Sequence, residues 1–236
     1  AVRNLKTGET ASLNAEEFFP SASLYKLAVM YEVFRQKQIG QLSTDEVLTI
    51  QPSQMKEANE DDSLSVGDNL TIQQALESMI GQSNNVAAFA LAERVGWEQI
   101  NQSMGALGLN YTRIPAGTWK TQVSDWRSTE SSTSPADMLT FFQALYSHKL
   151  ISPEASDAML KLLLDQRVND RIPSNLPAGT AVAHKTGNLP SIVNDAGIVY
   201  GPHADFIVVF LTHDVDESFA TTAEARLARR LYDVVN

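Results

Sequence analysis

The spacing of apolar residues divides this chain into segments with helical and strand-like patterns. A helix is predicted from residue 23 to 37, where apolar side chains recur every three or four positions, and Gly40 follows it as a C-cap. Thr71 and Gln74 form a capping-box start for a second helix. Further helices are predicted at 85–95, 97–107, 134–148, 152–165 and 217–235.

Strand-like patterns lie at the two ends of the chain, and the helices lie between them. Residues 1–5 and a second short strand form a predicted hairpin around Lys6–Glu9. Three more strands are predicted at 180–185, 192–200 and 205–212. The stretches 41–70 and 109–133 carry no periodicity and are expected to be irregular. The simplest fold is of the α/β (α+β) class, an antiparallel sheet built from both termini with a helical segment inserted between its second and third strands.

This order of elements predicts two interleaved domains, for which 236 residues are sufficient. The sheet domain would comprise residues 1–22 and 168–236, and the helical domain residues 23–167. The active site would lie in the cleft between them.

Composition narrows the classes of function. With 43% hydrophobic and 19% charged residues, we expect a soluble globular protein, and no apolar run approaches the roughly 18 residues of a membrane-spanning helix. The formal net charge of −10 argues against nucleic acid as a partner. The chain has no cysteine, and its four histidines have no metal-ligand spacing, so we expect neither a metal nor another cofactor. No signal peptide is visible.

Three short motifs, far apart along the chain, carry the candidate chemistry. Ser23 stands three residues before Lys26 at the start of the first predicted helix, so both side chains lie on one helix face. An unprotonated lysine in contact with a serine can activate it as a nucleophile. Ser83-Asn84-Asn85 and Lys185-Thr186-Gly187 follow in that order. Together the motifs predict a serine enzyme that forms an acyl intermediate.

Each motif also occurs a second time, in a context that disfavours it. Ser53 and Lys56 have the spacing of the first motif but lie in a polar stretch without a helical pattern. Lys6-Thr7-Gly8 falls in the predicted hairpin turn, and Ser12-Leu13-Asn14 precedes the helix-starting serine.

With these motifs the chain resembles the class A β-lactamases and the related penicillin-recognising peptidases, from about Val2 to Val235. The separations of 60 residues between Ser23 and Ser83, and of 102 between Ser83 and Lys185, are similar to those of class A. Segments 107–114 and 132–138 look like the approach to the family's Ω-loop and the exit from it. The resemblance implies a β-lactamase/transpeptidase-like fold, a monomer, and a secreted or periplasmic location.

The resemblance implies a catalytic role for several residues. Ser23 would be the nucleophile, and Lys26, unprotonated, would be the base of acylation. Ser83 would relay a proton to the leaving nitrogen. The backbone amides of Ser23 and Asn188 would form the oxyanion hole, the first of them near a helix N-terminus.

The resemblance also implies a binding role for several residues. Asn85 would hold the amide side chain of the substrate, and the Lys185-Thr186-Gly187 strand would bind its carboxylate. Many β-lactamases have an arginine that assists carboxylate binding, and Val193 stands at the corresponding position in this chain. Some class A members supply the cation from 14 residues before the lysine, where Arg171 stands, and a plain surface arginine is the alternative.

The chain departs from the family pattern in its Ω-loop, its second motif and its first residues. The stretch 116–122 lacks the glutamate that activates the deacylating water, and Asp125 and Glu130 are out of register with it. Asn84 replaces an aspartate, a change expected to affect loop rigidity more than chemistry. The chain begins in the first strand, so the helix that usually precedes it either was removed or is lacking.

Three functions are compatible with this pattern. The first is hydrolysis of β-lactam amides through Ser23, with slow deacylation. The second is a D-alanyl-D-alanine carboxypeptidase or esterase acting on cell-wall-like peptides, which the missing glutamate favours. The third is a non-catalytic β-lactam sensor or cell-wall protein. A Ser-His-Asp triad through His184 is disfavoured, because the chain has no Gly-x-Ser-x-Gly turn.

Overall fold

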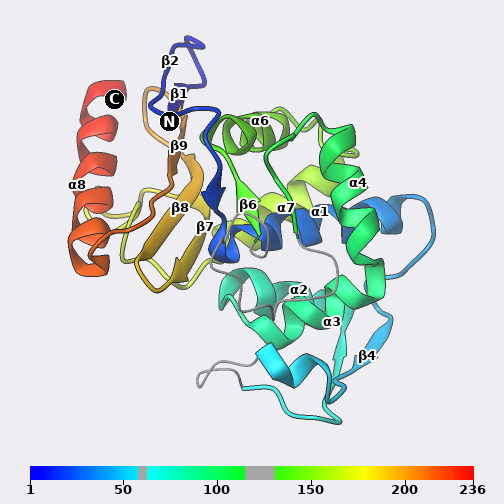
Figure 1. The fold of residues 1–236 in the computed structure, drawn as a ribbon. Helices are drawn as coiled ribbons and strands as arrows, with labels where there is room; N and C mark the ends of the chain where they lie inside the picture. Colours follow the sequence, from blue (N-terminus) through cyan, green and yellow to red (C-terminus); the bar gives the residue numbers. More distant parts are fainter. Residues whose placement is uncertain (58–62, 115–130) are drawn as a thin grey trace.

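The computed structural model describes residues 1–57, 63–114 and 131–236, and a five-stranded antiparallel sheet lies between two layers of helix (Figure 1). The strand order is β2-β1-β9-β8-β7. The first strand, β1 (Val2–Asn4), pairs with the last, β9 (Phe206–Phe210), so the two ends of the chain share one sheet. The predicted α/β class, with helices inserted between the second and third strands of this sheet, is confirmed.

The other strands are short at the N-terminal end and long at the C-terminal end. The sheet is completed by β2 (Thr10–Ala11), β7 (Val182–Leu189) and β8 (Ile192–Val199). Two small antiparallel pairs lie outside it: β3 (Phe19–Pro20) with β6 (Ser132–Thr133), and β4 (Val47–Thr49) with β5 (Asn69–Thr71).

Helices make up most of the segment between β2 and β7. The described helices are η1 (Ala22–Leu24), α1 (Tyr25–Gln38), η2 (Gln54–Glu57), α2 (Ile72–Gly81), α3 (Asn85–Val95), α4 (Trp97–Ala106), α6 (Pro135–Tyr146), α7 (Pro153–Leu164) and α8 (Glu217–Val235). Of these, α8 stands alone on one side of the sheet, and the others gather on the opposite side (Figure 1). No helix in the described ranges combines the length and apolar character that crossing a bilayer requires.

The alternation of side chains along the strands explains the two helical layers. On β9, Ile207 and Val209 belong to the cluster that contains the buried faces of α1 to α7. Phe206 and Val208, the intervening residues, belong to a second cluster that includes Ala228 of α8. Because successive strand residues point to opposite faces, an uninterrupted apolar strand is buried on both sides.

The helix ends follow the caps expected from the sequence. Thr71 and Gln74 form the reciprocal capping box that begins α2. Ser134 and Ser152 cap α6 and α7, and a proline occupies the first turn of each helix. Gly40, with φ of 73°, follows the end of α1 in the left-handed conformation that glycine accepts without a steric penalty.

Four expectations about local structure were wrong. Residues 41–70 are not wholly irregular, because β4 and β5 pair there, and 132–133 form β6 within a stretch expected to be a loop. Strand β7 does not end near residue 185 but continues to Leu189, because its second half pairs with β8 up to Ile192. The α-helix begins at Tyr25, after a 3₁₀ turn that contains Ser23. The strands among these elements depend on long-range pairing, which no local pattern reports. The domain limits at 22/23 and 167/168 stay a prediction.

Candidate active site

Ser23 lies in the 3₁₀ turn η1, which leads directly into α1. The preceding residue, Ala22, has a left-handed backbone with φ of 45°, a conformation that a non-glycine residue keeps only when its surroundings hold it. Ser21 supplies part of that restraint. Its N–H donates to the Ser131 carbonyl at 2.8 Å, and the Oγ atoms of the two serines are 2.7 Å apart. The position of the predicted nucleophile is therefore fixed by contacts on its N-terminal side.

Strand β7 runs against this turn, and Gly187 lies where they meet. A Cβ atom on Gly187 would lie 3.0 Å from the Ser21 carbonyl oxygen and 3.0 Å from the Ser23 nitrogen. Only a residue without a side chain allows two backbones to come this close. The two segments therefore lie close enough for the predicted oxyanion hole, whose two amides stay a prediction.

Lys26 is fully buried in the first turn of α1, and its amine reaches the second motif. Nζ donates to the Ser83 carbonyl, to Ser83 Oγ at 3.2 Å and to Asn85 Oδ1 at 2.6 Å. Ser83 sits on the turn between α2 and α3 with φ of 60°. Direct contact between Lys26 Nζ and Ser23 Oγ, which the helical spacing predicts, stays a prediction.

Lys185 approaches the same hydroxyl from the sheet. It is fully buried in the middle of β7, and its Nζ donates to Ser83 Oγ at 2.9 Å and to the Thr186 carbonyl at 2.8 Å. Two lysine amines from distant parts of the chain therefore contact one serine. The three motifs converge in space, as their joint assignment to one site requires.

The electrostatics of the site leave Lys185 readily deprotonated. Burial lowers the pKa of Lys185 to about 7, because an ammonium group loses hydration inside the protein. Asp195 on the neighbouring strand raises this pKa, and the Arg171 guanidinium lowers it. The amine thus changes charge near neutral pH.

Arg171 is only 2% exposed, so its interpretation as a plain surface arginine is wrong. Its Nη2 donates to Asn188 Oδ1 at 2.5 Å, and its Nη1 donates to the Asn194 carbonyl at 3.3 Å. The guanidinium lies beside the strand that carries the third motif. Val193, where many relatives have the equivalent arginine, is buried on β8.

A buried carboxyl group from α8 is within the electrostatic influence of this guanidinium. Glu224 is 3% exposed, and its two carboxyl oxygens have no hydrogen-bond partner among the described residues. The pKa of Glu224 is raised to about 9, chiefly by burial and also by the nearby Asp195 carboxylate, while the Arg171 guanidinium acts in the opposite direction.

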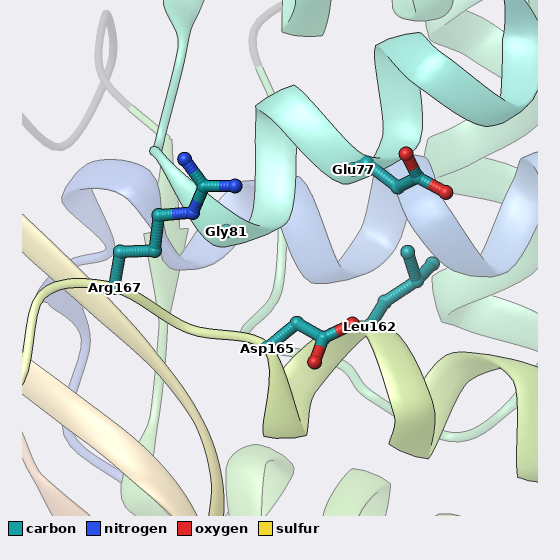
Figure 2. Close-up of a pocket in the computed structure, with 5 residues that line it drawn as sticks. All are labelled: Glu77, Gly81, Leu162, Asp165 and Arg167. Atoms are coloured by element: carbon teal, nitrogen blue, oxygen red, sulfur yellow. The ribbon is translucent and has the colours of Figure 1, made fainter.

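The connection after α7 makes hydrogen bonds to the end of α2, next to the turn that carries Ser83. The Gln166 side chain donates to the Ile80 carbonyl at 3.0 Å, and the Arg167 N–H donates to the Gly81 carbonyl at 3.0 Å. Figure 2 shows the Arg167 side chain rising toward Gly81 at the end of α2, beside a cavity of about 340 Å³ that Asp165 also lines. Residues 165–167 thus fix the C-terminal end of α2, two residues before Ser83.

His184 takes part in hydrogen bonds that exclude the triad interpretation. Its Nδ1 lies 2.8 Å from Asp195 Oδ1, and its Nε2 lies 3.1 Å from Asn169 Oδ1. Both ring nitrogens are therefore engaged by groups other than Ser23. A Ser-His-Asp triad needs one of them at the nucleophile.

Comparison with known proteins decides the family. The β-lactamase enzyme family matches residues 1–235. The chain belongs to the β-lactamase enzyme family. Membership makes the protein an enzyme, a serine hydrolase of the β-lactamase type.

Individual relatives of this β-lactamase-family enzyme are distant in sequence and similar in fold. Beta-lactamase VEB-1 from Pseudomonas aeruginosa is 24% identical over 239 residues, which cover 92% of this chain and 78% of VEB-1. The structure of a β-lactamase from Sphaerobacter thermophilus superposes with a TM-score of 0.90 at 24% identity, covering 99% of this chain and 89% of that one. The structure of PBP-A superposes with a TM-score of 0.87 at 24% identity, covering 99% and 87%.

This chain departs from the class A pattern at Asn84 and in the Ω-loop segment. Asn84, which replaces the usual aspartate, is the N-cap of α3, where its side chain accepts from the Ala87 N–H at 2.8 Å. The Ω-loop segment 116–122, together with Asp125 and Glu130, lies outside the described residues. The consequence of the missing glutamate therefore stays a prediction from the sequence.

Sequence reasoning missed one residue that helps to set the nucleophile. Asn194 on β8 donates from Nδ2 to the Pro20 carbonyl at 2.8 Å and accepts from the Thr212 N–H at 2.9 Å. It therefore connects the segment before Ser23 to β8 and to the residues that follow β9. A signal was present, because Asn194-Asp195 interrupts an otherwise apolar strand.

The close approach at Gly187 gives a test of the oxyanion geometry. We expect Gly187→Ala to lower the rate of acylation by a β-lactam about 10²-fold, because the added methyl group pushes β7 away from the Ser23 amide. Stopped-flow acylation kinetics would measure this. Gly105→Ala on α4 is the matched control, since a Cβ there meets nothing within 4 Å. Unchanged acylation in Gly187→Ala would show that the oxyanion amides do not depend on this contact.

Proposed function

We propose that this protein is a serine hydrolase that opens β-lactam amides through an acyl intermediate on Ser23. The observation that carries the proposal is the convergence of Lys26 and Lys185 on the Ser83 hydroxyl, at 3.2 and 2.9 Å. Acyl transfer needs a base beside the nucleophile and a proton donor beside the leaving nitrogen. The Ser83 hydroxyl can be the proton donor for the leaving nitrogen. Because it also contacts Lys26, it connects that donor to the base.

The acylation step follows from these contacts. Ser23 Oγ attacks the lactam carbonyl carbon while its proton passes to Lys26 Nζ, which must be unprotonated at that moment. The resulting oxyanion is stabilised by backbone amides of Ser23 and Asn188. The C–N bond then breaks, and the nitrogen takes a proton from Ser83 Oγ, which is replenished from the adjacent lysine amines. The product of this step is an ester of Ser23.

Substrate binding would use residues of β7 for the carboxylate and Asn85 for the amide side chain. Lys185 and Thr186, with Arg171 nearby, would hold the carboxylate common to penicillins and to C-terminal peptides. Asn85 would hold the amide side chain, although its Oδ1 accepts from Lys26 in the free enzyme. The active site would lie between the sheet domain and the helical domain. A periplasmic or extracellular location is part of this proposal.

The same site supports a second candidate, a D-alanyl-D-alanine carboxypeptidase or esterase. The observation that favours it is the absence of a carboxylate from residues 116–122, where class A β-lactamases carry the base for deacylation. Without that base, hydrolysis of the Ser23 ester would be slow, and a β-lactam would behave as an inhibitor. A binding protein that acylates without turnover is the limiting case.

Intact-mass spectrometry of the protein with a penicillin separates these functions. We expect an adduct of one penicillin per chain that forms quickly and decays slowly, and proteolysis should map it to the peptide that contains Ser23. Release of hydrolysed penicillin at many equivalents per enzyme supports a β-lactamase. A stable adduct with turnover of a D-alanyl-D-alanine peptide supports the peptidase. The absence of both an adduct and hydrolysed penicillin would overturn the proposal.

The pKa of Lys185 predicts a pH dependence. The charged amine would bind the substrate carboxylate, so the second-order rate constant of acylation should fall as pH rises through about 7, whereas a lysine of ordinary pKa 10.5 would stay charged there. Acylation rates on both sides of this pH would measure the effect. In Lys185→Arg the cation does not titrate in this range, and the fall should disappear. A wild-type rate that is flat through neutral pH would contradict the assignment.

A further inference from the structure

His184 lies next to Lys185 on β7, but its side chain is directed to the opposite face of the strand. It is fully buried and has two hydrogen-bond partners from different segments. Asp195 of β8 faces Nδ1 at 2.8 Å, and Asn169, from the connection after α7, faces Nε2 at 3.1 Å. The ring therefore joins three segments of the chain.

The partners of Asn169 determine which way its amide group faces. Its Nδ2 donates to the Gln166 carbonyl at 3.0 Å, and a carbonyl oxygen can only accept. Reversing the amide would place two oxygens against each other. The Oδ1 atom therefore faces His184, so the Nε2 atom of His184 carries a proton and donates it.

Asp195 contacts the other ring nitrogen of His184. Its Oδ1 contacts Nδ1 of His184, and its Oδ2 accepts from the Ile172 N–H at 3.1 Å. The histidine and the aspartate together hold residue 169 and residue 172, which lie on either side of Arg171. We call the set Asn169, His184, Asp195 and Ile172 the histidine brace.

Two of the partners of Arg171 lie on the sheet: it donates to Asn188 Oδ1 at 2.5 Å and to the Asn194 carbonyl at 3.3 Å. Its Nε has no hydrogen-bond partner among the described residues and lies 3.7 Å from the half-exposed carboxylate of Asp170, its neighbour on the connection. The brace holds the backbone on both sides of this residue. The guanidinium position is therefore set largely by the connection that carries it.

We propose that His184 is a positioning residue: through the histidine brace it holds the 169–172 connection so that Arg171 can serve the carboxylate-binding side of the active site. This rests on the proposed function, in which Arg171 assists carboxylate binding. His184 touches no reacting atom in this proposal. Its effect is on substrate affinity and passes through Arg171.

Kinetics of brace variants test the proposal. Asn169→Ala removes the acceptor of Nε2 at an exposed residue, and Asn175→Ala, at another exposed asparagine of the same connection, is the matched control. We expect Asn169→Ala to raise the KM of acylation about fivefold for a penicillin, with little change in the limiting rate. For the penicillin methyl ester, which lacks the carboxylate charge, KM should not change. His184→Gln should likewise raise KM for the penicillin and leave KM for its methyl ester unchanged.

A double variant separates positioning from general damage. In an Arg171→Ala background, Asn169→Ala should have no further effect, because its effect passes through the guanidinium. An equal loss with and without Arg171, or an equal loss for the acid and the ester, would overturn the proposal.

Nuclear magnetic resonance tests the brace without any enzymatic activity. In ¹⁵N-labelled protein we expect the His184 Nε2 proton to exchange slowly with water, and its signal is assigned by its absence in His184→Gln. Asn169→Ala should remove this protection. An unprotected Nε2 proton in the wild type, or a protected one that Asn169→Ala leaves unchanged, would refute the brace. If Ser23 forms no adduct and no penicillin is hydrolysed, the proposed function fails, and this measurement still decides the brace.

Discussion

Ser23→Ala should abolish the covalent adduct with a penicillin. The hydroxyl is the only group at this position that can form the ester, and its neighbours, Lys26 and Ser83, would remain in place. We expect the acylation rate to fall by at least about 10⁴-fold, to a level where intact mass detects no adduct. Ser23 is only partly buried, and removing its oxygen leaves the backbone of η1 unchanged in sequence, so the variant should fold.

The second Ser-x-x-Lys match supplies the control for this prediction. Ser53→Ala alters the exposed serine that precedes η2 and should acylate at the wild-type rate. Circular dichroism and a thermal melt of both variants would exclude unfolding as the cause. An adduct that persists in Ser23→Ala would mean that another nucleophile reacts and would end the assignment of this site.

The fold could be predicted where local signals agree with tertiary structure. The caps at Thr71, Ser134 and Ser152 mark helix starts, because a side-chain oxygen at these positions satisfies amides that the helix leaves free. The apolar strands at 192–199 and 206–210 are buried on both faces, so their pattern is continuous and readable. Short strands such as Val47–Thr49 gave no such signal, because their pairing partner lies some 20 residues away and local propensity is weak.

The candidate site could be predicted in its parts but not in its contacts. The order of Ser23, Ser83 and Lys185 indicated convergence, and both lysines do meet Ser83. Sequence could not reveal that Arg171 is buried, because isolated arginines are mostly exposed and burial depends on the whole fold.

Several polar side chains are buried behind β7. His184, Asp195 and Glu224 occupy the layer between the sheet and α8, where apolar side chains would pack with less cost. Their retention is understandable if they set the position and charge of groups on the active-site side, such as Arg171 and Lys185. Asp195 affects both, since it raises the pKa of Lys185 and accepts from the backbone beside Arg171.

Lys26→Arg should separate the two roles that a buried amine can have at this site. Arginine keeps a positive charge and hydrogen-bond donors, but it does not give up its proton in proteins, so it cannot act as the base. If Lys26 accepts the proton of Ser23, acylation should fall by about 10³-fold in both Lys26→Arg and Lys26→Met. If Lys26 only donates to Ser83 and Asn85, the arginine variant should keep much of its activity while the methionine variant loses it.

Lys37→Met on the exposed side of the same helix is the matched control, and it should acylate normally. Because the methionine stem fills the space of the lysine stem, Lys26→Met should keep the fold, and a thermal melt of both Lys26 variants would show whether the larger arginine is also accommodated. The decisive comparison is therefore between the arginine and methionine variants, measured as pre-steady-state acylation rates. Wild-type acylation in Lys26→Met would transfer the role of base to another group, for which Lys185 is the nearest candidate through Ser83.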